Sequence, residues 1–331
     1  MENKDKFRAD FKDVFNERDQ CQKKAKEFTN QCLKPAVEDF VNRSLGTDIT
    51  GEMRTKPQFS TRMFCQYSIL QDLLSKHDFD KYLKYICSYE KYVKKWILDQ
   101  IQLNLSNGSK VSEFEDRHIQ SSITNISDAI KKAKMQKSDN LKEFVEFAHW
   151  LTESVKEMGQ DLREKFKEPH ILTKLNHLHV KPQNELFSTL IGCGKQCPFC
   201  KSPCEAGGGA HTEHFASLHR PEGLGTYRWT QTNKLATDIC SSLVISDGRF
   251  RCHAINNAYH PYKDYRNIFP DWKIPPDGSL QASDYWKYVM AKFNNDFAKE
   301  YDAKHADIPS SWYEIKRNEA EESLKKSFSI K

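Results

Sequence analysis

Six of the ten cysteines in this 331-residue chain fall within one short stretch of the second half, and this clustering constrains the fold more than any other feature. The six are Cys193, Cys197, Cys200, Cys204, Cys240 and Cys252. The first residues, Met1 to Asp13, are too charged for a secretory signal peptide. Without such a signal, clustered thiols indicate metal ligands rather than disulfides. Four more lie singly on segments of helical periodicity and are predicted to be packing residues: Cys21, Cys32, Cys65 and Cys87.

The sharpest motif is Cys197-Pro-Phe-Cys200, followed by His214 and His219. Two thiolates separated by two residues lie on one tight turn and can chelate a single ion. Two imidazoles from a later loop complete a tetrahedron, which suits zinc because Zn²⁺ accepts sulfur and nitrogen without a strong geometric preference. We therefore predict one structural zinc, bound by Cys197, Cys200, His214 and His219.

Other assignments of the ligands stay open at this point. Cys204 is the first substitute, and Cys193 and His211 are also within reach along the sequence. A second metal site would have Cys240, Cys252, His253 and His260 as ligands. We prefer the simpler interpretation, in which Cys240 and Cys252 pack against a hairpin core. Without a metal, the thiols would be small buried hydrophobes or a redox pair. A redox pair normally opens a helix, which the neighbouring prolines do not favour.

The first half has the apolar spacing of helices. Apolar residues recur every three or four positions from Phe79 to Ile101 and from Phe28 to Leu45, where Gly46 is predicted to end the helix. A shorter stripe, Phe7 to Phe15, predicts another helix. The fold class expected is mainly α, with residues 1–168 forming a helical bundle or stalk.

Residues 169–331 differ in composition, because Gly, Pro, Cys and His accumulate there. Asp247-Gly248 lies between two short apolar runs and predicts a tight β-hairpin. Two C-terminal helices are expected, one from about Ser283 and one from about Ser311, where Ser311 and Glu314 have capping-box spacing. The second half is therefore predicted to be a small α+β module stabilised by zinc in place of a large core.

Several classes of function are disfavoured by the sequence. The net charge of +5 is spread over both halves, and the Gly-rich run before the histidines would not hold a DNA-reading helix, so nucleic acid is not an expected partner. No segment approaches the roughly 18 apolar residues of a membrane span. There is no phosphate-binding loop, no G-x-S-x-G and no H-E-x-x-H, so we expect no bound nucleotide and no enzyme activity. Glu213 is the single candidate for a zinc-assisted general base.

These residues resemble a known family. The segment Cys197 to Cys204 together with His211, His214 and the run His219 to Leu224 is similar to the C-terminal part of the interferon-inducible very large GTPases, a family that includes the up-regulator of cell proliferation. The resemblance extends upstream over Phe79 to Ile101. Downstream it extends over Tyr265 to Trp272, Tyr285 to Val289 and Ala306 to Pro309.

The resemblance implies a cytoplasmic protein, with the nucleus as an alternative, linked to interferon responses and innate immunity. It does not imply nucleotide hydrolysis, because this sequence lacks the Walker lysine of a GTPase domain. The chain is either a fragment of a larger GTPase or a stand-alone relative. Our leading hypothesis is a non-catalytic, zinc-binding interaction or assembly module that binds a protein partner or itself. The alternative is a zinc-dependent enzyme, such as a hydrolase or a ubiquitin-transfer module. The ubiquitin-transfer module would need either a cross-braced pair of zinc sites or an exposed, unliganded cysteine such as Cys193 or Cys240.

Overall fold

The computed structural model describes residues 18–136, 142–167, 170–207 and 210–330. The chain divides into two compact units, and neither is continuous in sequence. Unit 1 comprises Met1–Gly51 and Ile101–Pro182, and unit 2 comprises Glu52–Gln100 and Gln183–Lys331. The sequence predicts a single domain boundary, after residue 168. The contacts in the structure instead group residues 52–100 with residues 183–331. The helix predicted over Phe7 to Phe15 lies outside the described residues.

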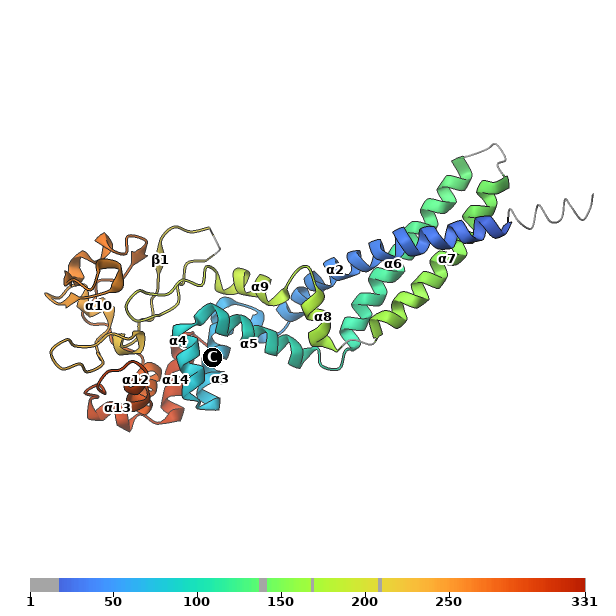
Figure 1. Cartoon of the computed structure of the whole chain (residues 1–331). Coiled ribbons are helices and arrows are strands. Elements are labelled where there is room, and N and C mark those ends of the chain that lie inside the picture. The colour runs from blue at the N-terminus through green and yellow to red at the C-terminus, as the bar shows by residue number, and fades with distance from the viewer. Residues whose placement is uncertain (1–17, 137–141, 168–169, 208–209, 331) are drawn as a thin grey trace, which may run out of the picture. The chain divides into compact units, whose positions relative to one another are not determined.

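Unit 1 is a bundle of long helices. Its elements are the helical residues 18–28, the π-helix η1 (Thr29–Leu33), α2 (Lys34–Arg54, which ends in unit 2), α6 (Ser109–Gln136), α7 (Lys142–Lys167) and α8 (Ile171–His177). Helices α2, α6 and α7 run alongside one another (Figure 1). Their apolar faces meet in a core that includes Val41, Ile119, Val155 and Leu162. The mainly α fold predicted from the apolar periodicity is confirmed.

Gly46 does not end a helix, contrary to the prediction. Helix α2 continues through it to Arg54. At Gly46 the backbone of Val180 approaches the helix closely. A Cβ atom at Gly46 would lie 2.3 Å from the carbonyl oxygen of Val180. The glycine therefore serves close packing within unit 1 rather than termination.

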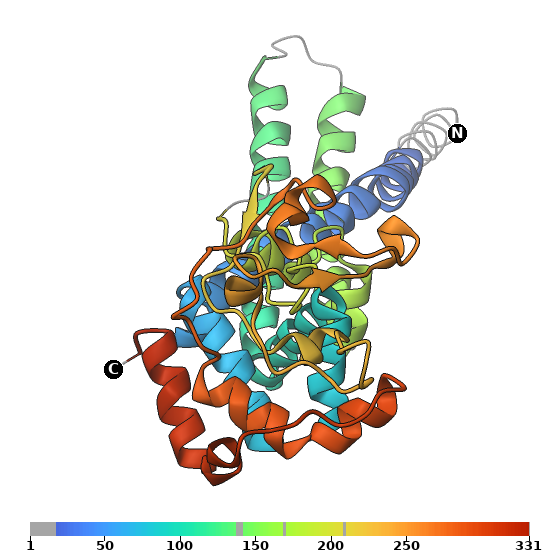
Figure 2. The same cartoon turned by 90° about the vertical axis from the view of Figure 1, so that its left-hand side faces the viewer.

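Unit 2 contains shorter helices around an aromatic core. They are η2 (Pro57–Phe59), α3 (Arg62–Lys76), α4 (Phe79–Cys87), α5 (Tyr89–Asn104, which ends in unit 1), α9 (Pro182–Leu186), η3 (Phe187–Ile191), α11 (Asp284–Lys292), α12 (Asn294–Glu300), α13 (Ser310–Glu314) and α14 (Arg317–Ser327). Helix α14 lies against α3 and α11 (Figures 1 and 2). At the centre, the Tyr285 hydroxyl donates to the Leu70 carbonyl at 3.0 Å.

Two boundaries differ from the sequence prediction. The stripe from Phe79 to Ile101 is two helices, because Ser88 has the non-helical angles φ −134° and ψ 47°. The capping interaction near the C-terminus is not at Ser311 and Glu314. It lies at α14, where the Lys316 backbone N–H donates to Glu319 Oε2 at 2.8 Å.

The region between η3 and α11 has little regular secondary structure. It holds the turns η4 (Glu222–Gly225), α10 (Cys240–Leu243), η5 (His253–Ile255) and η6 (Tyr262–Asn267). Strand β1 (His214–Phe215) pairs in parallel with β4 (Trp272–Lys273), and β2 (Arg249–Phe250) pairs antiparallel with β3 (His260–Pro261). The predicted hairpin strand before Asp247 is instead the helical turn α10, so β2 takes its partner from the downstream side.

A second core organises this strand-containing region. The buried ring of Phe199 has the rings of Tyr227, Phe250, Tyr262 and Phe269 at centroid distances of 4.9–5.7 Å. Because Phe199 lies inside the Cys-x2-Cys motif, the aromatic core and the cysteine cluster are parts of one structure.

The four isolated cysteines do not share one environment. Cys65 is buried, Cys21 is half-buried, and Cys32 and Cys87 are exposed. The prediction that all four are packing residues is therefore wrong for the last two. None of the described helices combines the length and the apolar character of a membrane span.

Candidate metal centres

Eight cysteine and histidine side chains gather into two clusters. The inner cluster consists of Cys197, Cys200, His219 and Cys240, all buried. The outer cluster consists of Cys193, Cys204, His211 and His214, of which two are half-buried. Within each cluster, the four potential ligand atoms all lie within 4.8 Å of one another. Both groups therefore have the composition and spacing to hold a metal ion.

The inner cluster is compact. The Cys197 and Cys240 sulfurs are 3.7 Å apart. His219 Nδ1 lies 3.3 Å from the Cys200 sulfur and 3.0 Å from the Cys240 sulfur. All ten cysteines of the chain are free thiols, so no disulfide competes for these sulfurs.

A tight turn presents the first two sulfurs of the inner cluster. The Lys201 N–H donates to the Cys197 carbonyl at 3.1 Å, and the Cys197 N–H donates to the Ser202 carbonyl at 2.7 Å. Lys201 has φ 60°, which reverses the chain directly after Cys200. The side-chain amide of Gln196 donates to the Lys201 carbonyl at 2.8 Å and fixes the turn. Local sequence thus brings Cys197 and Cys200 to the same point.

Long-range contacts bring His219 to this turn. Ser202 Oγ donates to the Leu218 carbonyl at 2.7 Å. Next to His219, the buried guanidinium of Arg220 lies 4.2 Å from the ring centroid of Trp286 on α11 and 5.2 Å from that of Tyr85 on α4. The segment that carries His219 is therefore anchored to the helical core of unit 2.

The inner cluster concentrates ionisable groups away from water. Burial raises the pKa of the Cys197 and Cys240 thiols well above the ordinary value. Burial also acts to raise the pKa of Cys200, but hydrogen bonds from Cys197 and Cys240 and the charge of His219 outweigh it and hold that pKa well below the ordinary value. A dication among these sulfurs would favour the thiolate form of all three.

The outer cluster contains two cysteines and two histidines. His211 Nε2 lies 3.4 Å from the Cys204 sulfur and 3.1 Å from His214 Nδ1. His214 Nδ1 lies 3.6 Å from the Cys193 sulfur. The Ala206 N–H donates to the Cys204 sulfur at 3.4 Å, a contact that stabilises a thiolate.

Neighbouring groups orient the outer cluster. Pairing of β1 with β4 places His214 beside Asp271, whose Oδ2 lies 3.5 Å from His214 Nε2. A carboxylate on the second ring nitrogen is a common way to fix a ligating histidine. The guanidinium of Arg62 on α3 donates to the carbonyls of Cys204 and Ala206.

The structure divides the four residues that the sequence placed in one site. Cys197, Cys200 and His219 come together in the inner cluster, whereas His214 lies in the outer cluster with Cys204. Sequence reasoning did not assign Cys240 to this motif. Counting donors provides a signal for it, because eight cysteines and histidines between residues 193 and 240 supply two complete tetrahedra.

The remaining candidates lie outside both clusters. Among the described residues, Cys252, His253 and His260 belong to no group of potential ligands. Cys252 packs against the aromatic core, and His260 Nε2 lies 3.0 Å from the Asp264 carbonyl oxygen. Glu213, the candidate general base, accepts a hydrogen bond from Arg266 at 2.9 Å on the surface.

The part of the chain that contains both clusters is similar to a known protein family. Residues 193–324, which contain both clusters, match the family model described as "Interferon-induced very large GTPase 1, C-terminal domain". Interferon-induced very large GTPase 1 of Mus musculus is 30% identical over 89% of this chain, and that of Homo sapiens is 28% identical over 89%. The chain spans 14% of the length of each relative. No solved structure shows significant similarity to it.

Both clusters and the helices around them thus lie in sequence shared with these proteins. Residues 193–324 are similar to the C-terminal domain of the interferon-induced very large GTPase family, and 89% of the chain is similar to these GTPases.

Proposed function

We propose that residues 193–324 form a non-catalytic interaction module held together by two structural zinc ions. The observation that carries the proposal is the spacing of the donor atoms. With Zn–S bonds of about 2.3 Å and Zn–N bonds of about 2.0–2.1 Å, a tetrahedral site has edges of about 3.8 Å between sulfurs, about 3.5 Å between sulfur and nitrogen and about 3.3 Å between nitrogens. The clusters show 3.7 Å, 3.0–3.6 Å and 3.1 Å for these edges.

The donor number supports a structural role for both ions. Each cluster supplies four protein ligands, whereas a catalytic zinc keeps one position for water or substrate. From residue 193 to residue 240 the described chain contains only the two-residue strand β1, the short turn η4 and the start of α10 as named elements. Zinc would supply the cross-links that regular hydrogen-bonded structure does not.

The setting of the module is inferred from its relatives. Both are named as interferon-induced GTPases, and we extend to this chain a role in the interferon response of innate immunity. Ten free thiols fit the reducing conditions of the cytoplasm or nucleus. Within a full-length GTPase the module would bind a protein partner or a second copy, while the GTPase domain would perform hydrolysis.

The order of the ligands favours a second candidate, a ubiquitin-transfer module. The inner pair Cys197 and Cys200 lies between the outer ligands Cys193 and Cys204, so the two clusters interleave along the chain. Two interleaved zinc sites form a cross-brace, which is one of the two features expected of such a module; the other is an exposed, unliganded cysteine. Transfer of ubiquitin to the chain or to a free lysine, in the presence of an activating and a conjugating enzyme, would establish this candidate.

The main test is the zinc content of the purified chain, measured by inductively coupled plasma mass spectrometry. We expect two zinc ions per chain. Cys200→Ser, in the inner cluster, and Cys204→Ser, in the outer cluster, should each reduce the content to one. The matched control is Cys252→Ser, because Cys252 is a half-buried cysteine of the same region outside both clusters, and it should keep two.

The same measurement separates the possible arrangements. A wild-type content of one zinc that both Cys204→Ser and Cys240→Ser leave in place would support the single site formed by Cys197, Cys200, His214 and His219, because the inner cluster needs Cys240. Absence of zinc from the wild-type chain would refute the proposal. An anomalous-difference map at the zinc edge would locate each ion in a crystal structure, and the electron density around the ion would show a water ligand if either site were catalytic.

A further inference from the structure

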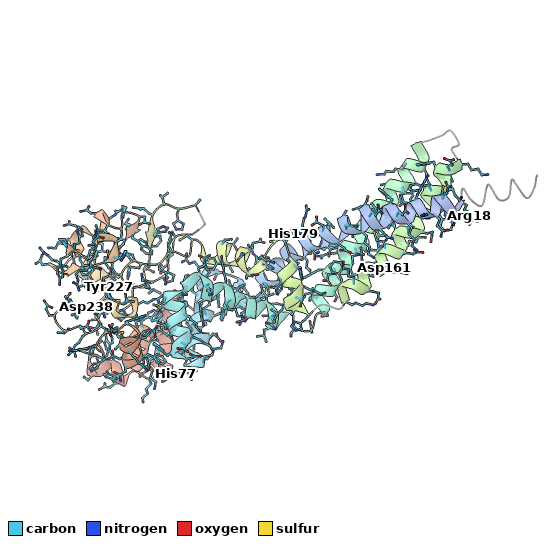
Figure 3. All side chains as sticks on the ribbon, viewed as in Figure 1. Arg18, His77, Asp161, His179, Tyr227 and Asp238 are labelled. Atoms are coloured by element: carbon cyan, nitrogen blue, oxygen red, sulfur yellow. The ribbon has the colours of Figure 1, made fainter. Side chains whose placement is uncertain are left out.

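A cleft of about 880 Å³ opens beside the inner cluster, entirely within unit 2. Its lining includes residues 225–231 and residues 248–254, 257 and 259. Tyr227, labelled in Figure 3, belongs to the first of these groups. A volume of this size is at the upper end of the range for ligand pockets and suits part of a larger molecule.

The lining of the cleft is strongly basic. Lys201, Arg228, Arg249 and Arg251 line it, and none of them forms an ion pair within the described parts of the chain. Within the described residues, the guanidinium of Arg228 donates to the backbone carbonyls of residues 301 and 302. Arg251 lies 5.1 Å from the ring centroid of Tyr259. The positive charge is not neutralised internally, so an anionic occupant is favoured.

The single acidic residue of the lining does not offset this charge. Glu222 is fully buried, and its Oε2 accepts the hydroxyl of Tyr262 at 2.5 Å. Burial raises its pKa well above the ordinary value, which favours the neutral form of the carboxyl. Its Oε1 is buried without a hydrogen-bond partner among the described residues.

The aromatic lining distinguishes between two kinds of anion. Stacked nucleic-acid bases need free ring faces. Here the rings of Tyr227, Phe250, Tyr262 and Phe269 already pack around Phe199. Trp229 and Tyr259 are the exceptions, with 41% and 53% of their surfaces exposed, and the guanidinium of Arg251 lies over the Tyr259 ring. One free indole can take a single apolar side chain, as in the anchor of a peptide interface.

We propose that this cleft binds an acidic peptide segment of a protein partner. Its carboxylates would meet the rim formed by Lys201, Arg228, Arg249 and Arg251, and one apolar side chain would pack on Trp229. The inference rests on the proposed interaction function and names the class of partner.

The test uses fluorescence anisotropy with the full chain and two fluorescein-labelled peptides of about twelve residues. One is rich in Asp and Glu and contains a leucine, and the other replaces its acids with Asn and Gln. The acidic peptide should bind about tenfold or more tightly, and the difference should shrink as salt rises. The double variant Arg249→Glu, Arg251→Glu should lose this preference.

A matched control has the same change in net charge. Lys132→Glu, Lys134→Glu reverses two exposed lysines of α6 in unit 1 and should bind like the wild type. Equal binding of both peptides, or an unchanged affinity in the arginine variant, would overturn the inference. Tighter binding of a labelled oligouridylate that depends on the same arginines would overturn it in favour of nucleic acid.

Zinc content measured on each sample keeps the two proposals separate. Binding of the acidic peptide by a chain without zinc would support the proposal for the cleft and refute the proposal for the metal sites. Two zinc ions per chain without a preference for the acidic peptide would support the metal sites and refute the proposal for the cleft.

Discussion

Replacing Gly225 with alanine should weaken metal binding at the inner cluster alone. Gly225 ends the turn η4 and lies against the backbone between the two inner cysteines of the Cys-x2-Cys motif. A Cβ atom there would lie 1.9 Å from the Phe199 carbonyl oxygen and 3.0 Å from the Cys200 Cα. Both are backbone atoms, so no rotation of a side chain can relieve the overlap.

The size of the effect follows from this geometry. Contacts of a Cβ below 3.0 Å essentially do not occur, so the turn has to move by about 1 Å. Overpacking costs about 1–3 kcal/mol, and a clash with rigid backbone belongs near the upper end. If loss of the ion releases the strain, about 3 kcal/mol corresponds to roughly a hundredfold weaker zinc binding.

The assay is competition for zinc with a chromogenic chelator, combined with mass spectrometry of alkylated thiols. In Gly225→Ala the inner cysteines, Cys197, Cys200 and Cys240, should become reactive at a chelator concentration that still leaves Cys193 and Cys204 protected. Gly207→Ala is the control, because a Cβ there meets nothing within 4 Å although Gly207 lies in the loop of the outer cluster. Two ions bound as tightly in Gly225→Ala as in the parent would refute the reasoning.

Two further predictions concern stability. Gly46→Ala should destabilise unit 1 by about 2–3 kcal/mol, measured by thermal unfolding, because the new Cβ would collide with the Val180 carbonyl. Gly51→Ala is the control, because its Cβ meets open space, and it should be neutral or slightly stabilising. Equal melting temperatures of the two variants would contradict this prediction. Burial, together with the charges of Lys292 and Arg317, lowers the pKa of His77 below 6.5, so the unfolded chain binds the proton more tightly and stability is lost as the pH falls below 6.5. His77→Asn tolerates the left-handed φ of 50° and should lose less stability than the wild type between pH 7.5 and 5.5 in urea titrations; parallel pH profiles would exclude the role of His77.

Helices were predictable from the sequence where one apolar stripe faces a core, but their ends were less so. The stripe from Phe79 to Ile101 continues across Ser88 because a break of one residue hardly changes the periodicity. Gly46 looks like a stop signal in sequence, whereas its role depends on Val180, more than a hundred residues away. Local patterns do not contain that information.

The metal ligands were predictable as a set but not in their division. Cys197 and Cys200 share a turn, so spacing alone pairs them. His214 and His219 are only five residues apart, yet strand pairing with β4 draws His214 toward Asp271, while Ser202 holds the segment before His219 near Cys200. Cys240 reaches the inner cluster through α10, where the sequence suggested a β-strand. Tertiary contacts, rather than spacing in the sequence, therefore place His214 in the outer cluster and His219 in the inner cluster.

The discontinuity of the two units has a consequence for synthesis of the chain. Helices α3 and α4 leave the ribosome some two hundred residues before their partners α11 and α14. Tyr82 and Tyr285, which meet in the core of unit 2, must wait for one another while all of unit 1 beyond Gln100 is made. Nascent unit 2 therefore exposes an aromatic surface until α11 and α14 have been made, and a fragment that starts at residue 169 would expose the complementary surface permanently.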